Sequence, residues 1–382
     1  MQHKGSSFKT GKIVTLALLL LMIMSISNDN DIKAQNTIST GVPFLLIGPN
    51  SRFCGMGETG TAISDDATAM HWNPSGLAFQ DIGTELNFTH SPWLAGLGIS
   101  DLFYDYLAAR RHIKSINGTV GVSLTYLNIG EVLYRDEFGN SDPSKDYKAY
   151  EYAIAFGYAT KLNEDFGVGV TARFIYSRLS PTDLTVGGET GTGTAFTTSF
   201  DLAGMYRPVS HGPSFIKDRL SIGLSLSNLG PKISYVDASQ ADPIPTQLRL
   251  GLAYKVLQIE GNELTLAVDF SKLLVNRYTE NGEPKSDPFY EAIFTSWNGG
   301  ISGIAKSIQT SIGAEYWYGS PKLIALRAGF FYEDPTNGNR KYITLGAGIR
   351  YSLYGFDFSY IDALEENHPL ANTLRFGLLV TF

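Results

Sequence analysis

The stretch that most constrains the fold is residues 372–382, N-T-L-R-F-G-L-L-V-T-F. Its apolar side chains recur at every second position, at Leu374, Phe376, Leu378, Val380 and Phe382. This is the period of a β-strand with one apolar face. The same pattern recurs at strand length along the chain and here stops on an aromatic residue, as outer-membrane barrels typically do. The first inference is therefore a transmembrane β-barrel whose apolar register faces lipid.

The N-terminal segment has the pattern of a secretory signal peptide. Lys4, Lys9 and Lys12 supply positive charge, an apolar run covers residues 13–26, and Ala34 offers a small residue for cleavage. The run is too short for a confident helical span, which needs about 20 apolar residues. We expect residues 1–35 to be removed. The exported chain would then be either a soluble secreted protein or a barrel.

Composition narrows the function classes. The formal net charge of −7 argues against a nucleic-acid partner, because phosphate binding needs clustered Lys and Arg. The 40 glycines and the 12% aromatic content suit a barrel, whose strands bend and whose aromatics populate the membrane interfaces. Cys54 is the single cysteine, so no intrachain disulfide is possible. We expect it to be an ordinary packed thiol.

Alternation predicts an all-β, fourteen-stranded antiparallel barrel. The predicted strands cover about 83–90, 101–111, 118–128, 150–161, 165–177, 197–207, 219–228, 247–256, 263–272, 309–318, 322–331, 341–352, 354–361 and 372–382. Single charges such as Arg173, Asp269 and Arg350 fall in the inward register. A globular core would not accept them unpaired, whereas a polar lumen would.

The connections test this layout independently. An even strand number places both termini of the barrel on the periplasmic side, so the odd-numbered connections should face outside and be long. The four longest are 129–149, 178–196, 229–246 and 273–308, and all are odd-numbered. One even-numbered connection, 208–218, is longer than a turn.

Residues 36–82 do not alternate and precede the first strand. They are too apolar for an unfolded tail and too irregular for a strand, so we predict a plug inside the lumen, followed by the barrel at 83–382. The residues expected to shape this plug are Pro43, Phe44, Arg52, Gly55, Gly57, Trp72, Asn73 and Pro74.

No motif predicts catalysis, a cofactor or a metal. Residues 55–60, G-M-G-E-T-G, match the dinucleotide fingerprint literally, but the required strand, helix and βαβ unit are not evident. The histidines are scattered without cysteine partners, and the acidic residues of 136–146 do not fit calcium-loop spacing. Neither a nucleophile elbow nor a phosphate-binding loop occurs.

Aromatic and apolar residues gather in two of the outer connections. Candidates for partner binding are Leu133, Tyr134 and Phe138 in one, and Tyr278, Phe289, Tyr290, Phe294 and Trp297 in the longest. Clustered aromatics on long loops suit a protein-binding surface. Packing within the loops, or contact with the membrane interface, would explain them nearly as well.

Two groups of motifs resemble the PorV family of the type IX secretion system. Near the start they are P-F-L-L-I at 43–47, Gly55-Met-Gly57 and H-W-N-P at 71–74. Near the end they are R-A-G-F-F-Y-E at 327–333 and P-L-A-N-T-L-R-F at 369–376. Departures at Cys54 and at 75–76 lie within the predicted plug.

The resemblance implies a barrel similar to the fatty-acid transporter FadL and a non-enzymatic role in the outer membrane. It implies that the protein binds secreted cargo through a C-terminal signal domain, using its outer loops. It also implies delivery from the translocon to an attachment complex containing the sortase PorU. The alternatives are a FadL-like transporter of hydrophobic molecules, which the polar inward residues disfavour, and a general porin, which the plug disfavours.

Overall fold

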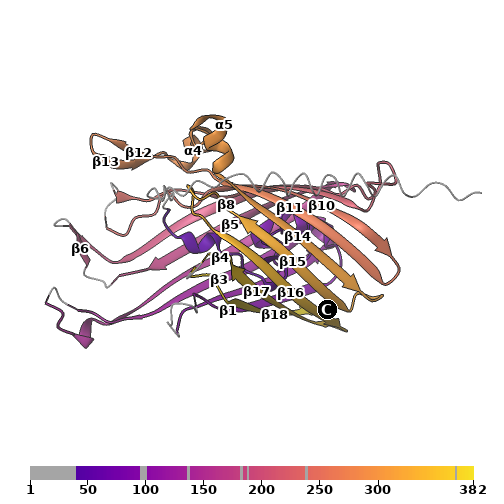
Figure 1. Cartoon of the computed structure of the whole chain (residues 1–382), viewed down its shortest axis with the longest axis horizontal. Helices are drawn as coiled ribbons and strands as arrows, with labels where there is room; N and C mark the ends of the chain where they lie inside the picture. Colours follow the sequence, from indigo (N-terminus) through magenta and orange to yellow (C-terminus); the bar gives the residue numbers. More distant parts are fainter. Residues whose placement is uncertain are drawn as a thin grey trace, which may run out of the picture. The chain divides into compact units, whose positions relative to one another are not determined.

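The computed structural model describes residues 40–94, 101–135, 138–180, 184–186, 189–236, 240–365 and 368–382. The predicted signal segment, 1–35, lies outside these ranges. Within them, fourteen antiparallel strands close into one barrel (Figure 1). They are β1 (Thr84–Pro92), β2 (Phe103–Ile113), β3 (Gly118–Val132), β4 (Tyr147–Asn163), β5 (Phe166–Arg178), β8 (Thr194–Tyr206), β9 (Leu220–Leu229), β10 (Gln247–Ile259), β11 (Asn262–Leu273), β14 (Ile308–Tyr318), β15 (Ile324–Tyr332), β16 (Lys341–Tyr351), β17 (Tyr354–Ala363) and β18 (Thr373–Thr381). The predicted fold class and strand count are confirmed.

Strand β18 shows why the alternating pattern forms a barrel wall. Phe376 and Leu378 are exposed on the outer face, whereas Arg375 and Leu379 point inward and are buried. β18 pairs with β17 on one side and with β1 on the other, where Phe88 lies opposite Leu378. The pairing of the last strand with the first satisfies the backbone hydrogen bonds that an open sheet edge would expose to lipid.

The two ends of the barrel differ, as the connection lengths predict. At one end, the turn end, β1 begins and β18 finishes, and the Thr84 N–H donates to the Phe382 carbonyl at 2.6 Å. The short turns and the 207–219 connection lie there too. The long connections meet at the opposite end, the loop end. In Figure 1 these loops lie on the side away from the label C.

Several connections contain regular structure that the sequence analysis did not predict. The β5–β8 connection holds β6 (Leu184–Val186) and β7 (Glu189–Gly191); the β11–β14 connection holds β12 (Arg277–Glu280), β13 (Glu283–Ser286), α4 (Phe289–Thr295) and α5 (Gly300–Lys306). Short 3₁₀ turns η4 (Lys114–Ile116) and η5 (Pro143–Lys145) complete the loops. These elements are too short for a clear periodic signal. Strands β3 and β4 also extend past their predicted ends, because pairing continues beyond a bulge at Asn128 and Gly130.

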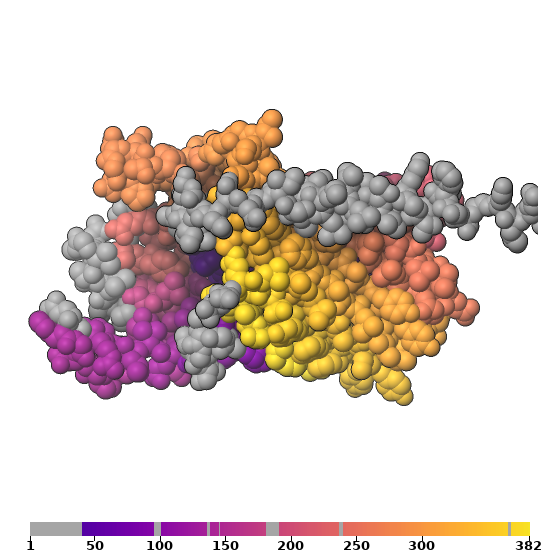
Figure 2. Space-filling view, viewed as in Figure 1, coloured from indigo at the N-terminus to yellow at the C-terminus, as the bar shows by residue number. Residues whose placement is uncertain are grey.

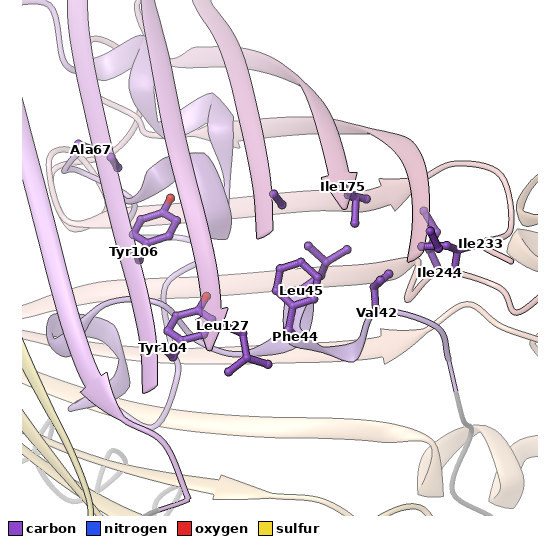
Figure 3. Close-up of a cluster of buried hydrophobic side chains, with 13 residues drawn as sticks. Val42, Phe44, Leu45, Ala67, Tyr104, Tyr106, Leu127, Ile175, Ile233 and Ile244 are labelled. Atoms are coloured by element: carbon purple, nitrogen blue, oxygen red, sulfur yellow. The ribbon is translucent and has the colours of Figure 1, made fainter. Parts of the chain in front are cut away.

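Residues 40–82 fill the barrel interior and are called the plug. It contains η1 (Pro43–Leu46), α2 (Ser51–Cys54), α3 (Ala69–Trp72) and η2 (Pro74–Phe79). Figure 3 shows Phe44 and Leu45 among wall residues that include Leu127 and Ile175, with Ile233 and Ile244 close by. This apolar contact buries the start of the plug.

Glycines let the plug backbone touch the wall backbone directly. Gly57 has a φ of +68°, and a Cβ added there would lie 2.6 Å from the amide nitrogen of Phe330. A Cβ on wall residue Gly329 would lie 2.0 Å from the amide nitrogen of Gly57. Neither position can hold a side chain without a shift of the backbone.

On the face shown in Figure 2, β14–β18 form a continuous orange-to-yellow wall, and the segment that carries α4 and α5 protrudes from it. Among the described residues, no helix is both long and apolar enough to cross a membrane.

Candidate functional site

The plug is held to the wall by a buried arginine. The Arg52 guanidinium donates from Nε and Nη2 to the Glu315 carboxylate of β14, at 2.8 Å each. Its Nη1 contacts Asp65 at 2.5 Å and Asp66 at 3.1 Å within the plug. Two-point contact between a planar guanidinium and a carboxylate is the strong form of this interaction. Arg52 therefore ties both halves of the plug to one strand.

The ion pairs continue along the wall from Glu315. Arg327 Nε contacts Glu315 at 2.8 Å, and its Nη1 contacts Asp357 at 2.8 Å. Asp357 also forms an ion pair with Arg350, whose Nη2 lies 2.7 Å from the carboxylate. These inward charges are paired with one another, which offsets the cost of removing them from water.

Other wall residues accept hydrogen bonds from the plug backbone. Asp269 of β11 accepts from the N–H groups of Gly60 and Thr61 at 2.9 and 2.8 Å. Glu85 of β1 accepts from Ala67 N–H at 2.6 Å. The plug is thus fixed to strands on different sides of the barrel.

The residues predicted to shape the plug differ in their burial and in the contacts they make. Trp72 is fully buried, donates from its ring nitrogen to Asn50 at 2.9 Å, and lies under the Arg249 guanidinium at 4.9 Å. The Asn73 carboxamide oxygen caps η2 by accepting from the Ser75 N–H, and Pro74 opens that turn. Phe44 is buried, Pro43 is exposed at the start of η1, and a Cβ on Gly55 would lie 3.0 Å from Gly346 Cα.

Two separate cavities flank the plug. One of about 470 Å³ at the turn end is lined by charged groups, including Arg207, Lys255 and Lys322. One of about 410 Å³ at the loop end is lined by Leu46, Trp93, Arg340 and Arg375 among others. They share no lining residue, and plug residues line both.

The predicted loop residues lie in two groups, on the β3–β4 connection and on the β11–β14 connection. We call their exposed members the loop surface. It consists of Leu133, Phe138, Tyr278, Tyr290, Phe294 and Trp297, together with Ile301. Phe138 is 81% exposed and Phe294 is 78% exposed. Tyr134 and Phe289 are half-buried, and the Phe289 ring packs edge-on against Tyr290 at 5.6 Å.

Ile301 was not singled out in the sequence, although it is 91% exposed. Its exposure depends on α5, and the only sequence signal is its spacing of three residues from Ile304. Together, α4 and α5 present apolar side chains to solvent over two short helices.

Polar contacts fix the base of this helical segment. Asp287 accepts from the Thr295 hydroxyl at 2.5 Å and from the Asn276 amide at 2.9 Å, and these hydrogen bonds lower the pKa of Asp287. The Trp297 ring lies under Lys272 Nζ at 5.3 Å, and that ammonium donates to Ser307 at 2.7 Å. These contacts hold in place the segment that carries the exposed side chains of α4 and α5.

The sequence profile of the family described as "Type IX secretion system protein PorV" matches residues 30–280, more than half of the chain. The chain belongs to the PorV family. It is an outer-membrane β-barrel of type IX secretion. No match to it is found among curated proteins.

Solved structures show the same fold at low identity. The Ralstonia pickettii toluene transporter TbuX is 14% identical, with a TM-score of 0.51 over 88% of this chain and 98% of that one. The Pseudomonas putida toluene transporter TodX is 12% identical, with a TM-score of 0.50 over 87% and 97%. These likenesses support the predicted FadL-like barrel and say nothing about what this chain binds.

PorV and FadL-like transporter families are in general not enzymes. Within the described part of the chain, no three His, Cys, Asp or Glu side chains are grouped as a metal site would require.

Proposed function

We propose that this PorV-family barrel is a carrier that binds secreted proteins at its loop end. It recognises their C-terminal signal domain, collects them at the type IX translocon and passes them to a cell-surface attachment complex containing a PorU-like sortase. The loop end would face the outside, and both ends of the barrel chain would face the periplasm.

The observation that carries this proposal is the loop surface. Tyr290, Phe294 and Ile301 expose large apolar side chains on α4 and α5, at the end of the barrel where long loops gather. Scattered exposed apolar residues are ordinary, but clusters on protruding elements are typical of protein-binding sites. Aromatic anchors commonly dominate the energy of such interfaces.

The barrel interior favours a carrier of proteins over a channel that conducts molecules through the lumen. The plug fills the lumen, Arg52 is paired with Glu315 of the wall, and the plug backbone meets wall glycines without intervening space. A transporter of hydrophobic molecules would need an apolar passage, which the paired charges of Arg52, Glu315 and Arg327 interrupt.

The test combines Tyr290→Ala, Phe294→Ala and Ile301→Ala in one variant. Loss of an anchor side chain commonly costs about 2 kcal/mol or more, so the variant should bind a purified cargo signal domain at least about 100-fold more weakly. Affinity is measured on detergent-purified protein, after heat-modifiable migration has shown that the barrel is folded. A second variant, Tyr134→Ala with Phe138→Ala, asks whether the β3–β4 connection contributes.

The matched control is Phe215→Ala, which removes an equally exposed aromatic from the turn end. We expect unchanged cargo binding. Cargo binding that survives both loop variants and is lost with Phe215→Ala would place the binding face at the wrong end of the barrel.

A further inference from the structure

The loop-end cavity contains a buried cation without a partner. Arg375 faces inward from β18 and is only 1% exposed. Among the described residues, its Nε and Nη1 groups have no hydrogen-bond partner, and it makes no ion pair. Its guanidinium carbon lies over the Trp93 ring, 5.7 Å from the ring centroid.

Three other buried lumenal arginines differ from Arg375 in this respect, whereas Arg249 also lacks an ion pair within the described part of the chain but donates to the Gln247 side chain at 2.7 Å. Arg52, Arg173 and Arg327 each contact a carboxylate at 2.8 Å or closer. An arginine is always charged, and a buried charge without a partner costs several kcal/mol. The guanidinium of Arg375 is therefore arranged for an anion that enters the cavity.

Neither carboxylate in the cavity lining is paired with Arg375. Glu333 is paired with Arg340 at 2.7 Å. Glu58 also lines the cavity and forms no ion pair with Arg375. Among the described residues, the lining supplies no carboxylate within ion-pair distance of Arg375.

The lining indicates what kind of anion fits. Leu46, Trp93 and Leu370 offer apolar contacts, and Gln309 and Asn337 offer amides. Gln309 already donates to Glu333, and Asn337 already donates to the Lys306 carbonyl. Their remaining hydrogen-bonding capacity and the Glu333–Arg340 pair would face hydrocarbon beside an aliphatic tail, whereas a peptide backbone can hydrogen-bond to them. The volume of about 410 Å³ is within the usual range of ligand sites.

The cavity is reached from the loop end. Asn337 and Gly338 belong to the β15–β16 connection, and Leu370 belongs to the β17–β18 connection. Gly48 and Glu58 of the plug also line it. A chain that enters from the loops would stop against the plug, so the site suits a chain end rather than a chain in transit.

We propose that Arg375 binds the C-terminal carboxylate of the secreted protein, whose last residues occupy the loop-end cavity. This inference rests on the proposed function, because it names the part of the cargo that the carrier holds. The loop surface would bind the body of the signal domain, and Arg375 would recognise its end.

The experiment uses a cargo signal domain in two forms that differ only at the last residue, one with a free carboxylate and one with a primary amide. Both are titrated against the full-length barrel in detergent. The amide should bind roughly 10- to 100-fold more weakly, the usual effect of losing a charge-assisted hydrogen bond. In Arg375→Gln, the free acid should weaken to the same level, and the two forms should become equal.

Lys306→Gln is the matched control, since it removes a positive charge from α5 that does not line the cavity. It should leave the preference for the free acid intact. Arg375→Lys keeps the positive charge and should retain part of that preference. Partial retention would show that the loss in Arg375→Gln comes from the missing charge and not from a misfolded barrel.

Equal binding of both forms to the wild-type barrel would overturn this inference and leave the proposed function standing. No binding of either form would overturn both. Saturable, Arg375-dependent binding of decanoate, with equal binding of the two domain forms, would assign the site to a fatty acid and overturn the peptide assignment.

Discussion

Arg52 shows how one side chain holds the plug in place. Its guanidinium joins Asp65 and Asp66 to Glu315. Arg52→Met would remove the only cation paired with buried Asp66 among the described residues and would leave buried Glu315 with Arg327 alone. Breaking a buried pair costs about 3–5 kcal/mol. We expect the plug to become sensitive to protease in the variant while the barrel stays heat-modifiable. Limited proteolysis followed by mass spectrometry measures this.

The control is Lys285→Met, which breaks an exposed ion pair with Glu280 in the β12–β13 hairpin. Exposed pairs contribute about 0–1 kcal/mol, so plug protection should not change. Equal protection of the plug in wild type and Arg52→Met would show that the backbone contacts hold the plug without the arginine.

A substitution in β18 tests which face of this strand contacts lipid. Leu378 lies near the middle of the strand on the outer face and is exposed there. An arginine near the bilayer midplane costs about 2–4 kcal/mol, so Leu378→Arg should reduce the folded fraction in lipid vesicles. Urea titration monitored by heat-modifiable migration gives the change in the free energy of unfolding.

Leu353→Arg makes the same chemical change in the exposed turn between β16 and β17. Near the membrane interface the cost falls to about 0–1 kcal/mol. If both variants lose stability equally, depth in the bilayer is not the cause and the assigned lipid-facing register is wrong.

The whole molecule is predicted to be closed. The plug occupies the lumen and is tied to β1, β11 and β14. In planar bilayers, the intact protein should show little steady conductance, and deletion of residues 43–73 should raise it because the paired lumenal charges would then face water. Replacement of the β12–β13 hairpin, 277–286, by a short Gly-Ser link should leave conductance low. Large, stable currents from the intact chain would contradict a closed lumen.

The barrel was predictable from the residue pattern alone. Alternation is a local property, because successive strand residues must face lipid and lumen in turn, and it predicted fourteen strands within a few residues of their observed bounds. Connection lengths predicted the difference between the two ends. Motifs such as P-F-L-L-I at 43–47 and R-A-G-F-F-Y-E at 327–333 pointed to the family that the profile match shows.

The contacts between plug and wall depend on the three-dimensional fold and were not predictable from the sequence. Arg52 and Glu315 are 263 residues apart in sequence, and their contact depends on strand register and on the path of the plug. The close approach of Gly57 to Gly329 and the lack of a partner for Arg375 among the described residues arise in the same way. Periodicity shows which side of the wall a residue faces, but its partner across the lumen is set by how the whole barrel closes.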